Sequence, residues 1–117
     1  RADIVASLHT TDPVIIEVKV FDGESRGRSH IRQGFRQTHD YMRDYDKSVG
    51  YLVIFNVCDK DLQFRLTNSE KPPRVHLNNK TLFLIVVDVY HNILPASERP
   101  QLELYEIKED ELVEASE

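Results

Sequence analysis

The chain has 117 residues, of which 40% are hydrophobic and 30% are charged, and its formal net charge is −5. This composition is typical of a globular protein, and the length predicts one domain over residues 1–117. No apolar run is long enough to span a membrane, no signal-peptide pattern is present, and the single cysteine, Cys58, excludes an internal disulfide. We therefore expect an intracellular, cytoplasmic protein without a membrane partner.

The first half of the chain predicts a hairpin followed by a strand–helix–strand unit. Residues 2–9 and 14–21 read as strands joined by a tight turn, which favours an antiparallel pair. A polar loop follows, and the helical spacing of apolar residues from His30 to about Asp46 predicts a helix, with Ser29 as its cap. Its core stripe would be Ile31, Phe35, Thr38, Met42 and Tyr45. Residues 51–57 form an apolar strand that we expect to lie parallel to the second strand.

The second half of the chain predicts further strands. Residues 62–66 read as a short strand, residues 67–79 as a polar loop, residues 82–90 as a buried strand and residues 102–107 as an edge strand. The acidic tail from about 108 to 117 is expected to be frayed. The fold class is therefore α/β, with a mixed sheet and a central helix on one face.

The charge is distributed unevenly along the chain. From Glu103 to the end there are seven acidic residues and one Lys, and the rest of the chain carries 14 basic against 13 acidic residues. The four arginines of residues 26–36 have no acidic residue among them. Such a run is either a solvated helix face or a surface that contacts phosphates.

The strand 14–21 carries Glu17 and Lys19 among apolar residues. The two side chains point to the same face, and Val14, Ile16, Val18 and Val20 point to the other, which we expect to be buried. A same-face salt bridge is the structural explanation of this pair. Asp3, in the preceding strand, suggests a second explanation, which is a metal site formed with Glu17. Two converging carboxylates repel each other unless a cation lies between them, and Mg²⁺ and Mn²⁺ favour such oxygen ligands.

The order Asp3, then Glu17-Val18-Lys19, then a helix with Gln37 and Tyr41 resembles the PD-(D/E)XK nuclease superfamily, which has the restriction-endonuclease-like fold. Gln37 and Tyr41 match the Q-x-x-x-Y element of its exonuclease-like branches. The resemblance covers about residues 1–57. It departs from the family pattern in Ala2, which stands where the family often has Pro, and in the family's elements upstream of the Asp. Since the chain begins at Arg1 rather than Met, we expect a fragment, a processed chain or an excised domain, in which those elements are absent or lie upstream of Arg1.

The resemblance implies a divalent-metal-dependent nuclease that hydrolyses phosphodiester bonds, in DNA rather than RNA. It implies that Asp3, Glu17 and the carbonyl of Val18 hold Mg²⁺ or Mn²⁺. Lys19 would orient the attacking water or offset the developing negative charge. Gln37 would position a water or a backbone phosphate, with Tyr41 stacking or donating beside it. The phosphate contacts would come from Arg26, Arg28, Arg32 and Arg36. The family also implies a possible homodimer or a place in a larger multidomain protein.

An alternative stays open: a catalytically inactive module of this fold that binds nucleic acid or a partner protein. In a third hypothesis the acidic tail docks a partner or covers the basic residues. His30 and His39 flank the candidate site and are expected to be exposed on the helix.

Overall fold

The computed structural model describes residues 4–6, 14–92, 95, 97 and 101–115. In chain order the elements are β1 (Ile4–Ala6), β2 (Val14–Phe21), α1 (Arg28–Asp44), β3 (Val49–Asn56), β4 (Lys60–Arg65), β5 (Arg74–Leu77), β6 (Lys80–Asp88), α2 (Val89–Asn92), β7 (Glu103–Lys108) and α3 (Glu109–Ala115).

The main sheet has five strands in the order β1-β2-β3-β6-β5. Strands β2, β3 and β6 are parallel, whereas β1 and β5 pair antiparallel with their neighbours. The predicted antiparallel hairpin, the parallel pairing of residues 14–21 with the strand after the helix, and the α/β class with a mixed sheet are confirmed. Strands β4 and β7 form a separate two-stranded parallel sheet, so residues 103–108 are the edge strand that the sequence predicts.

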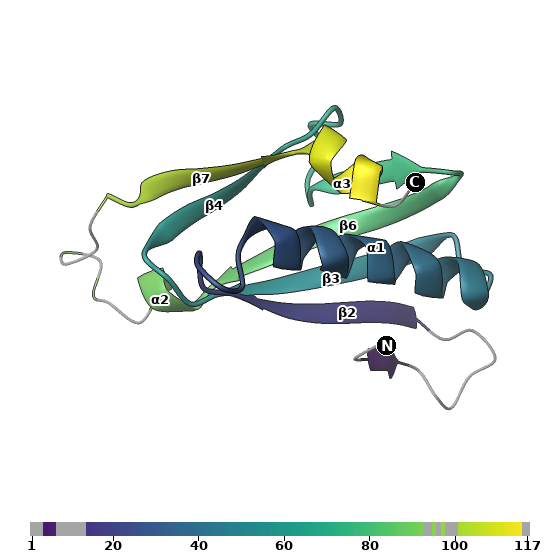
Figure 1. Ribbon diagram of the computed structural model, residues 1–117, viewed down its shortest axis with the longest axis horizontal. Coiled ribbons are helices and arrows are strands. Elements are labelled where there is room, and N and C mark those ends of the chain that lie inside the picture. The colour runs from purple at the N-terminus through teal and green to yellow at the C-terminus, as the bar shows by residue number, and fades with distance from the viewer. Residues whose placement is uncertain (1–3, 7–13, 93–94, 96, 98–100, 116–117) are drawn as a thin grey trace.

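One face of the main sheet carries the other elements. Figure 1 shows α1 lying along this face, with α3 and the β4–β7 sheet on the same side of the main sheet. The core lies between these layers, where the fully buried side chains include Phe21, Phe35, Ile54, Leu84 and Ile107. Burial of these aliphatic and aromatic groups drives the packing of α1 and the small sheet onto the main sheet.

Helix α1 buries the predicted stripe except at its end. Ile31, Phe35, Thr38 and Met42 are all fully buried, but Tyr45 is 49% exposed because the helix ends at Asp44. The predicted cap at Ser29 is wrong. Gly27 precedes the helix, and the backbone N–H of Arg28 donates to the hydroxyl of Tyr105 in β7 over 3.0 Å. A distant tyrosine thus satisfies one of the free amides of the first turn.

Two parts of the second half differ from the prediction. The segment 67–79, predicted as a loop, contains β5, which turns into β6 through Asn78 and Asn79 at φ values of 53° and 62°. Two residues with positive φ suit a tight hairpin whose twist matches its strands. The tail, predicted to be frayed, forms α3 within the described residues, and Leu112 of this helix is fully buried.

Among the described residues, no helix is both long enough and apolar enough to cross a membrane.

Candidate functional site

Glu17 and Lys19 lie on the face of β2 that α1 covers. Ile15, Glu17 and Phe21 are buried on this face, and Glu17 is only 1% exposed. The opposite face of β2, predicted to be the buried one, is only partly covered, and its Val20 is 39% exposed. The prediction reversed the two faces, because alternation along the strand shows which residues share a face but not which face the helix covers.

The Lys19 side chain packs against α1 at a glycine. A Cβ atom on Gly34 would lie 2.8 Å from Cγ of Lys19 and 3.2 Å from Cδ1 of Leu52. The aliphatic part of Lys19 is therefore held between β2 and the helix, and the side chain as a whole is only half-buried. Long cationic side chains commonly bury their stems in this way while the charged end reaches water.

Gln37 lies one helical turn after Gly34. The next residue, Thr38, would be 3.2 Å from a Cβ on Gly50, and Gly50 pairs with Ile15 in β2. Contacts between α1 and the sheet therefore run from Lys19 and Leu52, beside Gly34, to Gly50, beside Thr38, and Leu52 pairs with Glu17. The Oε1 atom of Gln37 is buried and has no hydrogen-bond partner among the described residues. Tyr41, one turn further, is half-buried and packs against the core.

His30 lies one turn before Gly34 and is also half-buried. Burial lowers the pKa of its imidazole, and the positive charges of Lys19 and Arg26 lower it further. Its imidazole is therefore harder to protonate than that of an exposed histidine. His39, in contrast, is 5% exposed and its Nε2 lies 3.4 Å from Nδ2 of Asn78, so the expectation that it is an exposed helix residue is wrong.

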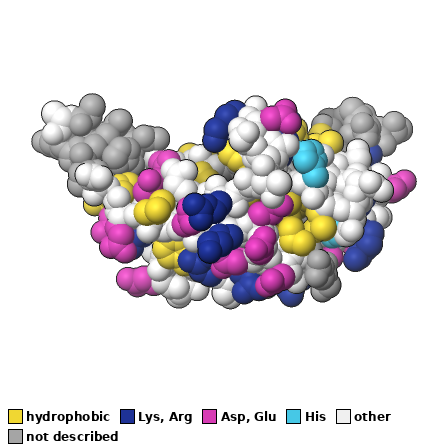
Figure 2. Space-filling view, turned by 90° about the horizontal axis from the view of Figure 1, so that it is seen from above, with side chains coloured by type: hydrophobic (Ala, Val, Ile, Leu, Met, Phe, Trp, Pro, Cys, Tyr) yellow, Lys and Arg dark blue, Asp and Glu magenta, His cyan; other side chains and the backbone are white. Residues whose placement is uncertain are grey.

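The four arginines divide into two pairs. Arg28 donates from Nη1 to both carboxylate oxygens of Glu111, at 2.8 and 2.9 Å, and Nε of Arg32 donates to the Glu111 carbonyl at 3.0 Å. Arg26 and Arg36 are exposed. Arg32 and Arg36, with Ser29 and Gln33, line a shallow hollow of about 420 Å³. Figure 2, which views the molecule from above Figure 1, shows basic and acidic side chains interspersed rather than a surface of one sign.

The contact between the arginines and α3 is electrostatically matched. The backbone N–H of Lys108 donates to Oε2 of Glu111 over 2.9 Å. This hydrogen bond and the guanidinium of Arg28 hold the pKa of the Glu111 carboxyl below its usual range. Part of the predicted phosphate-contacting surface is thus occupied by the chain's own acidic helix.

Two buried side-chain groups, one on β2 and one on α1, offer oxygen atoms. The buried carboxylate of Glu17 and the buried Oε1 of Gln37 are oxygen ligands of the kind that Mg²⁺ and Mn²⁺ accept. The side chain of Val18 points to the other face, so only its carbonyl is available. Asp3 lies outside the described residues, and within those residues no three His, Cys, Asp or Glu side chains gather at one point.

A second feature was not found from the sequence. A groove of about 910 Å³ lies between β4 and β6 and contains none of the predicted site residues. It forms because β4 pairs with β7, about 40 residues away along the chain, and local periodicity gives no signal for such a pairing. Asp88, which the sequence marks only as a strand end, lies in this groove and accepts a 3.1 Å hydrogen bond from Asn56.

Comparison with protein-family models, with curated proteins and with solved structures finds no match to this chain. Function is therefore inferred from the residues themselves, above all from Glu17, Lys19 and the helix turns that cover them.

Proposed function

We propose that the chain is a divalent-metal-dependent nuclease of the restriction-endonuclease-like fold that hydrolyses phosphodiester bonds in DNA. The observation that carries the proposal is the burial of Glu17 beside Lys19, on one face of a strand and under one helix. Carboxylates are rarely buried to this extent without an ion, a paired charge or a catalytic role. The antiparallel β1–β2 pair and the parallel β2–β3 pair joined by α1 agree with the fold of this superfamily.

The proposal gives each residue a part. Asp3, Glu17 and the carbonyl of Val18 would hold Mg²⁺ or Mn²⁺. In the described part of the hairpin the first residue of β1, Ile4, pairs with Ile16. A divalent ion supplies polarisation of the scissile phosphate and a more acidic water.

The remaining residues would act on the substrate directly. Lys19, its stem fixed by Gly34, would present its ammonium to the attacking water or to the charge that develops on the phosphate. Gln37 would orient a water or a phosphate oxygen through its free Oε1 or its amide, with Tyr41 supporting it from the next turn. Arg26 and Arg36, both exposed, would contact backbone phosphates, which contributes affinity without sequence preference.

The test combines metal binding with cleavage. Mn²⁺ is titrated by calorimetry into the parent, Glu17→Gln and Lys19→Ala, and each protein is then incubated with plasmid and single-stranded DNA. We expect Glu17→Gln to lose metal binding and cleavage, and Lys19→Ala to keep metal binding but lose cleavage by about 100-fold or more. Glu24→Gln, a change at an exposed acid on the loop before α1, is the matched control. Cleavage by Glu17→Gln at the parent rate overturns the proposal.

A second candidate function is a catalytically inactive module that binds nucleic acid or a partner protein. The contact of Glu111 with Arg28 and Arg32 favours it, because it removes two cations from the surface that a substrate backbone would meet. This function predicts DNA binding that is unchanged by a chelator and by Glu17→Gln. Metal-dependent turnover in the parent excludes it.

A further inference from the structure

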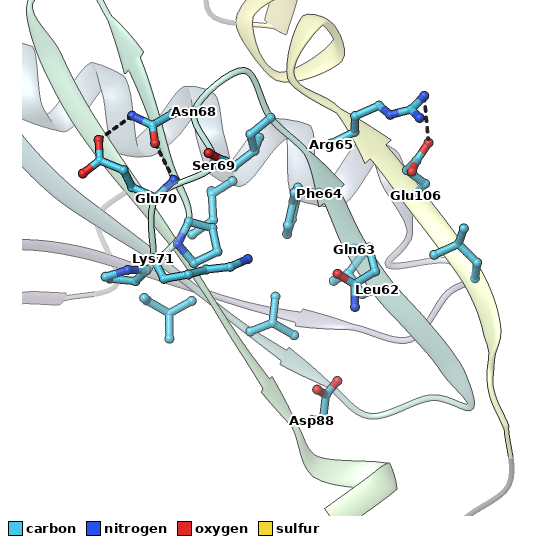
Figure 3. A pocket seen from close by; sticks show the side chains of 17 residues that line it. Leu62, Gln63, Phe64, Arg65, Asn68, Ser69, Glu70, Lys71, Asp88 and Glu106 are labelled. Carbon is cyan, nitrogen blue, oxygen red and sulfur yellow. Dashed lines mark hydrogen bonds and ion pairs between the residues drawn. The ribbon is translucent and has the colours of Figure 1, made fainter.

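A groove of about 910 Å³ lies between β4 and β6, away from the site described above. Figure 3 shows it open between the two strands, with Asp88 near one end and Glu70 and Lys71 farther along. Its lining includes apolar side chains from both sheets, among them Leu62, Phe64, Leu84 and Val86, and the Pro72-Pro73 segment.

The edge of β6 borders this groove. Strand β5 pairs with β6 only from Lys80 to Phe83, and Pro73 accepts one more hydrogen bond from the N–H of Leu84. From Ile85 onward β6 has a described strand, β3, on one side only. Side chains from both faces of β6, Ile85 on one and Val86 on the other, line the groove, which requires the strand edge itself to lie along it.

The direction of the backbone at this edge follows from one hydrogen bond. The N–H of Leu84 points toward β5. Backbone groups of a strand alternate in direction, so the N–H and C=O of Val86 point the same way, into the groove. Unpaired groups of this kind form the template on which another strand adds.

The edge of β4 borders the groove from the other side. Within the described residues β4 has β7 as its one strand neighbour. Leu62 and Phe64 from one face of β4, and Gln63 and Arg65 from the other, all line the groove. The groove therefore lies between two strand edges that lack partners among the described residues, above a floor of aliphatic and aromatic side chains.

We propose that this groove binds an extended peptide segment of a partner protein by strand addition. The backbone of the segment would pair with the β6 edge at Val86, and its alternate side chains would rest on Phe64, Leu84 and Val86. The lining carries three acidic residues, Glu70, Asp88 and Glu106, against Arg65 and Lys71. Arg65 pairs with Glu106 and Arg74 pairs with Glu70. Asp88, at one end of the groove, therefore offers the acidic group that a basic residue of the peptide would meet.

The probe is a blocked hexapeptide of alternating valine and threonine with one terminal lysine, titrated into the isotopically labelled chain and followed by amide chemical shifts. We expect the amides of Val86 and Phe64 to shift and saturate. The same peptide N-methylated at alternate residues loses backbone donors but keeps its side chains, and we expect it to bind at least about tenfold more weakly. Equal binding of the two peptides overturns strand addition, and so does the absence of saturable shifts at the groove.

Two variants provide a matched comparison. Val86→Lys places a long cationic side chain in the groove, whereas Val20→Lys makes the same change on β2, which β3 separates from β6, at a residue that is 39% exposed. We expect Val86→Lys to abolish binding and Val20→Lys to leave it within about twofold of the parent. Circular dichroism establishes that both variants are folded. If Val86→Lys does not fold, the N-methylated peptide on the parent decides. Preferred binding of a single-stranded oligonucleotide at the same amides also overturns the proposal.

Discussion

Lys19 and Gly34 touch across the interface between β2 and α1, and the contact exists because residue 34 has no side chain. A Cβ on Gly34 would lie 2.8 Å from Cγ of Lys19, closer than carbon atoms approach without rearrangement. Because Gly34 has no Cβ, the side chain of Lys19 can pack directly against the helix at this position. The first prediction follows from this contact.

Gly34→Ala should destabilise the chain and displace Lys19. Alanine favours the helix by about 1 kcal/mol over glycine, but overpacking against Lys19 and Leu52 costs about 1–3 kcal/mol, so we expect a net loss of about 1 kcal/mol in urea unfolding. If the proposed nuclease activity holds, cleavage should fall more than stability accounts for. The double variant Gly34→Ala with Lys19→Ala should recover the stability, and a single variant more stable than the parent would contradict the contact.

Glu17→Met tests whether the Glu17 carboxylate acts in catalysis or stabilises the fold through an ion pair. Replacing a buried charge by an apolar side chain of similar size is often neutral or stabilising, whereas breaking a required buried pair costs about 3–5 kcal/mol. We expect the free energy of unfolding to stay within about 1 kcal/mol of the parent value while Mn²⁺-dependent cleavage disappears. A loss of about 3 kcal/mol or more, measured in urea, would show that Glu17 serves the fold.

Glu111→Gln tests whether α3 restrains the arginines. The two charge-assisted hydrogen bonds from Arg28 are partly exposed, so we expect a loss of only about 1 kcal/mol in stability. Arg32 donates to the backbone carbonyl of residue 111 and keeps that bond, but release of Arg28 should tighten binding to a single-stranded oligonucleotide and make its dependence on salt steeper, since the freed cation adds a phosphate contact. Glu114→Gln, an exposed change on the same helix, is the control. An unchanged salt dependence would contradict the masking of Arg28.

Leu112→Ala tests the packing of α3 apart from its charges. Leu112 is fully buried, and truncating such a leucine costs about 2–5 kcal/mol through lost burial and a residual cavity. We expect a loss near the lower end of that range, since a short helix at the edge of the core can partly collapse onto the cavity. Thermal unfolding by calorimetry measures it, and a melting temperature equal to that of the parent would show that α3 does not add to the stability of the fold.

The contact of Glu111 should depend on pH. Its pKa is lower in the folded chain than the ordinary value of about 4.5, first through the Lys108 amide and then through Arg28. A carboxyl group with a depressed folded pKa stabilises the fold above its unfolded pKa, and this contribution is lost as the pH falls through the folded pKa. We therefore expect the stability difference between the parent and Glu111→Gln to be present at pH 7 and to shrink below about pH 4.5. Urea midpoints at pH 7 and at pH 3 measure it, and a difference that is the same at both would contradict the assignment.

The sequence by itself determined the local elements and the pairing of the first half. The alternation of residues 14–21, the helical period of Ile31, Phe35 and Met42, and the apolar run 51–57 follow from the geometry of strands and helices, which local residue patterns report directly. The same alternation placed Glu17 and Lys19 on one face. Asp3, the remaining carboxylate of the predicted site, lies outside the described residues.

Three features were visible only in the folded chain: the buried face of β2, the docking position of α3 and the groove between β4 and β6. These features depend on contacts between residues far apart in the chain, such as Lys19 with Gly34, Arg28 with Glu111 and β4 with β7. Each such contact is chosen by the total burial and charge pairing of the whole chain, and local propensity does not report it. For that reason the sequence predicted a frayed acidic tail where the structure has α3, and it did not predict the groove between β4 and β6.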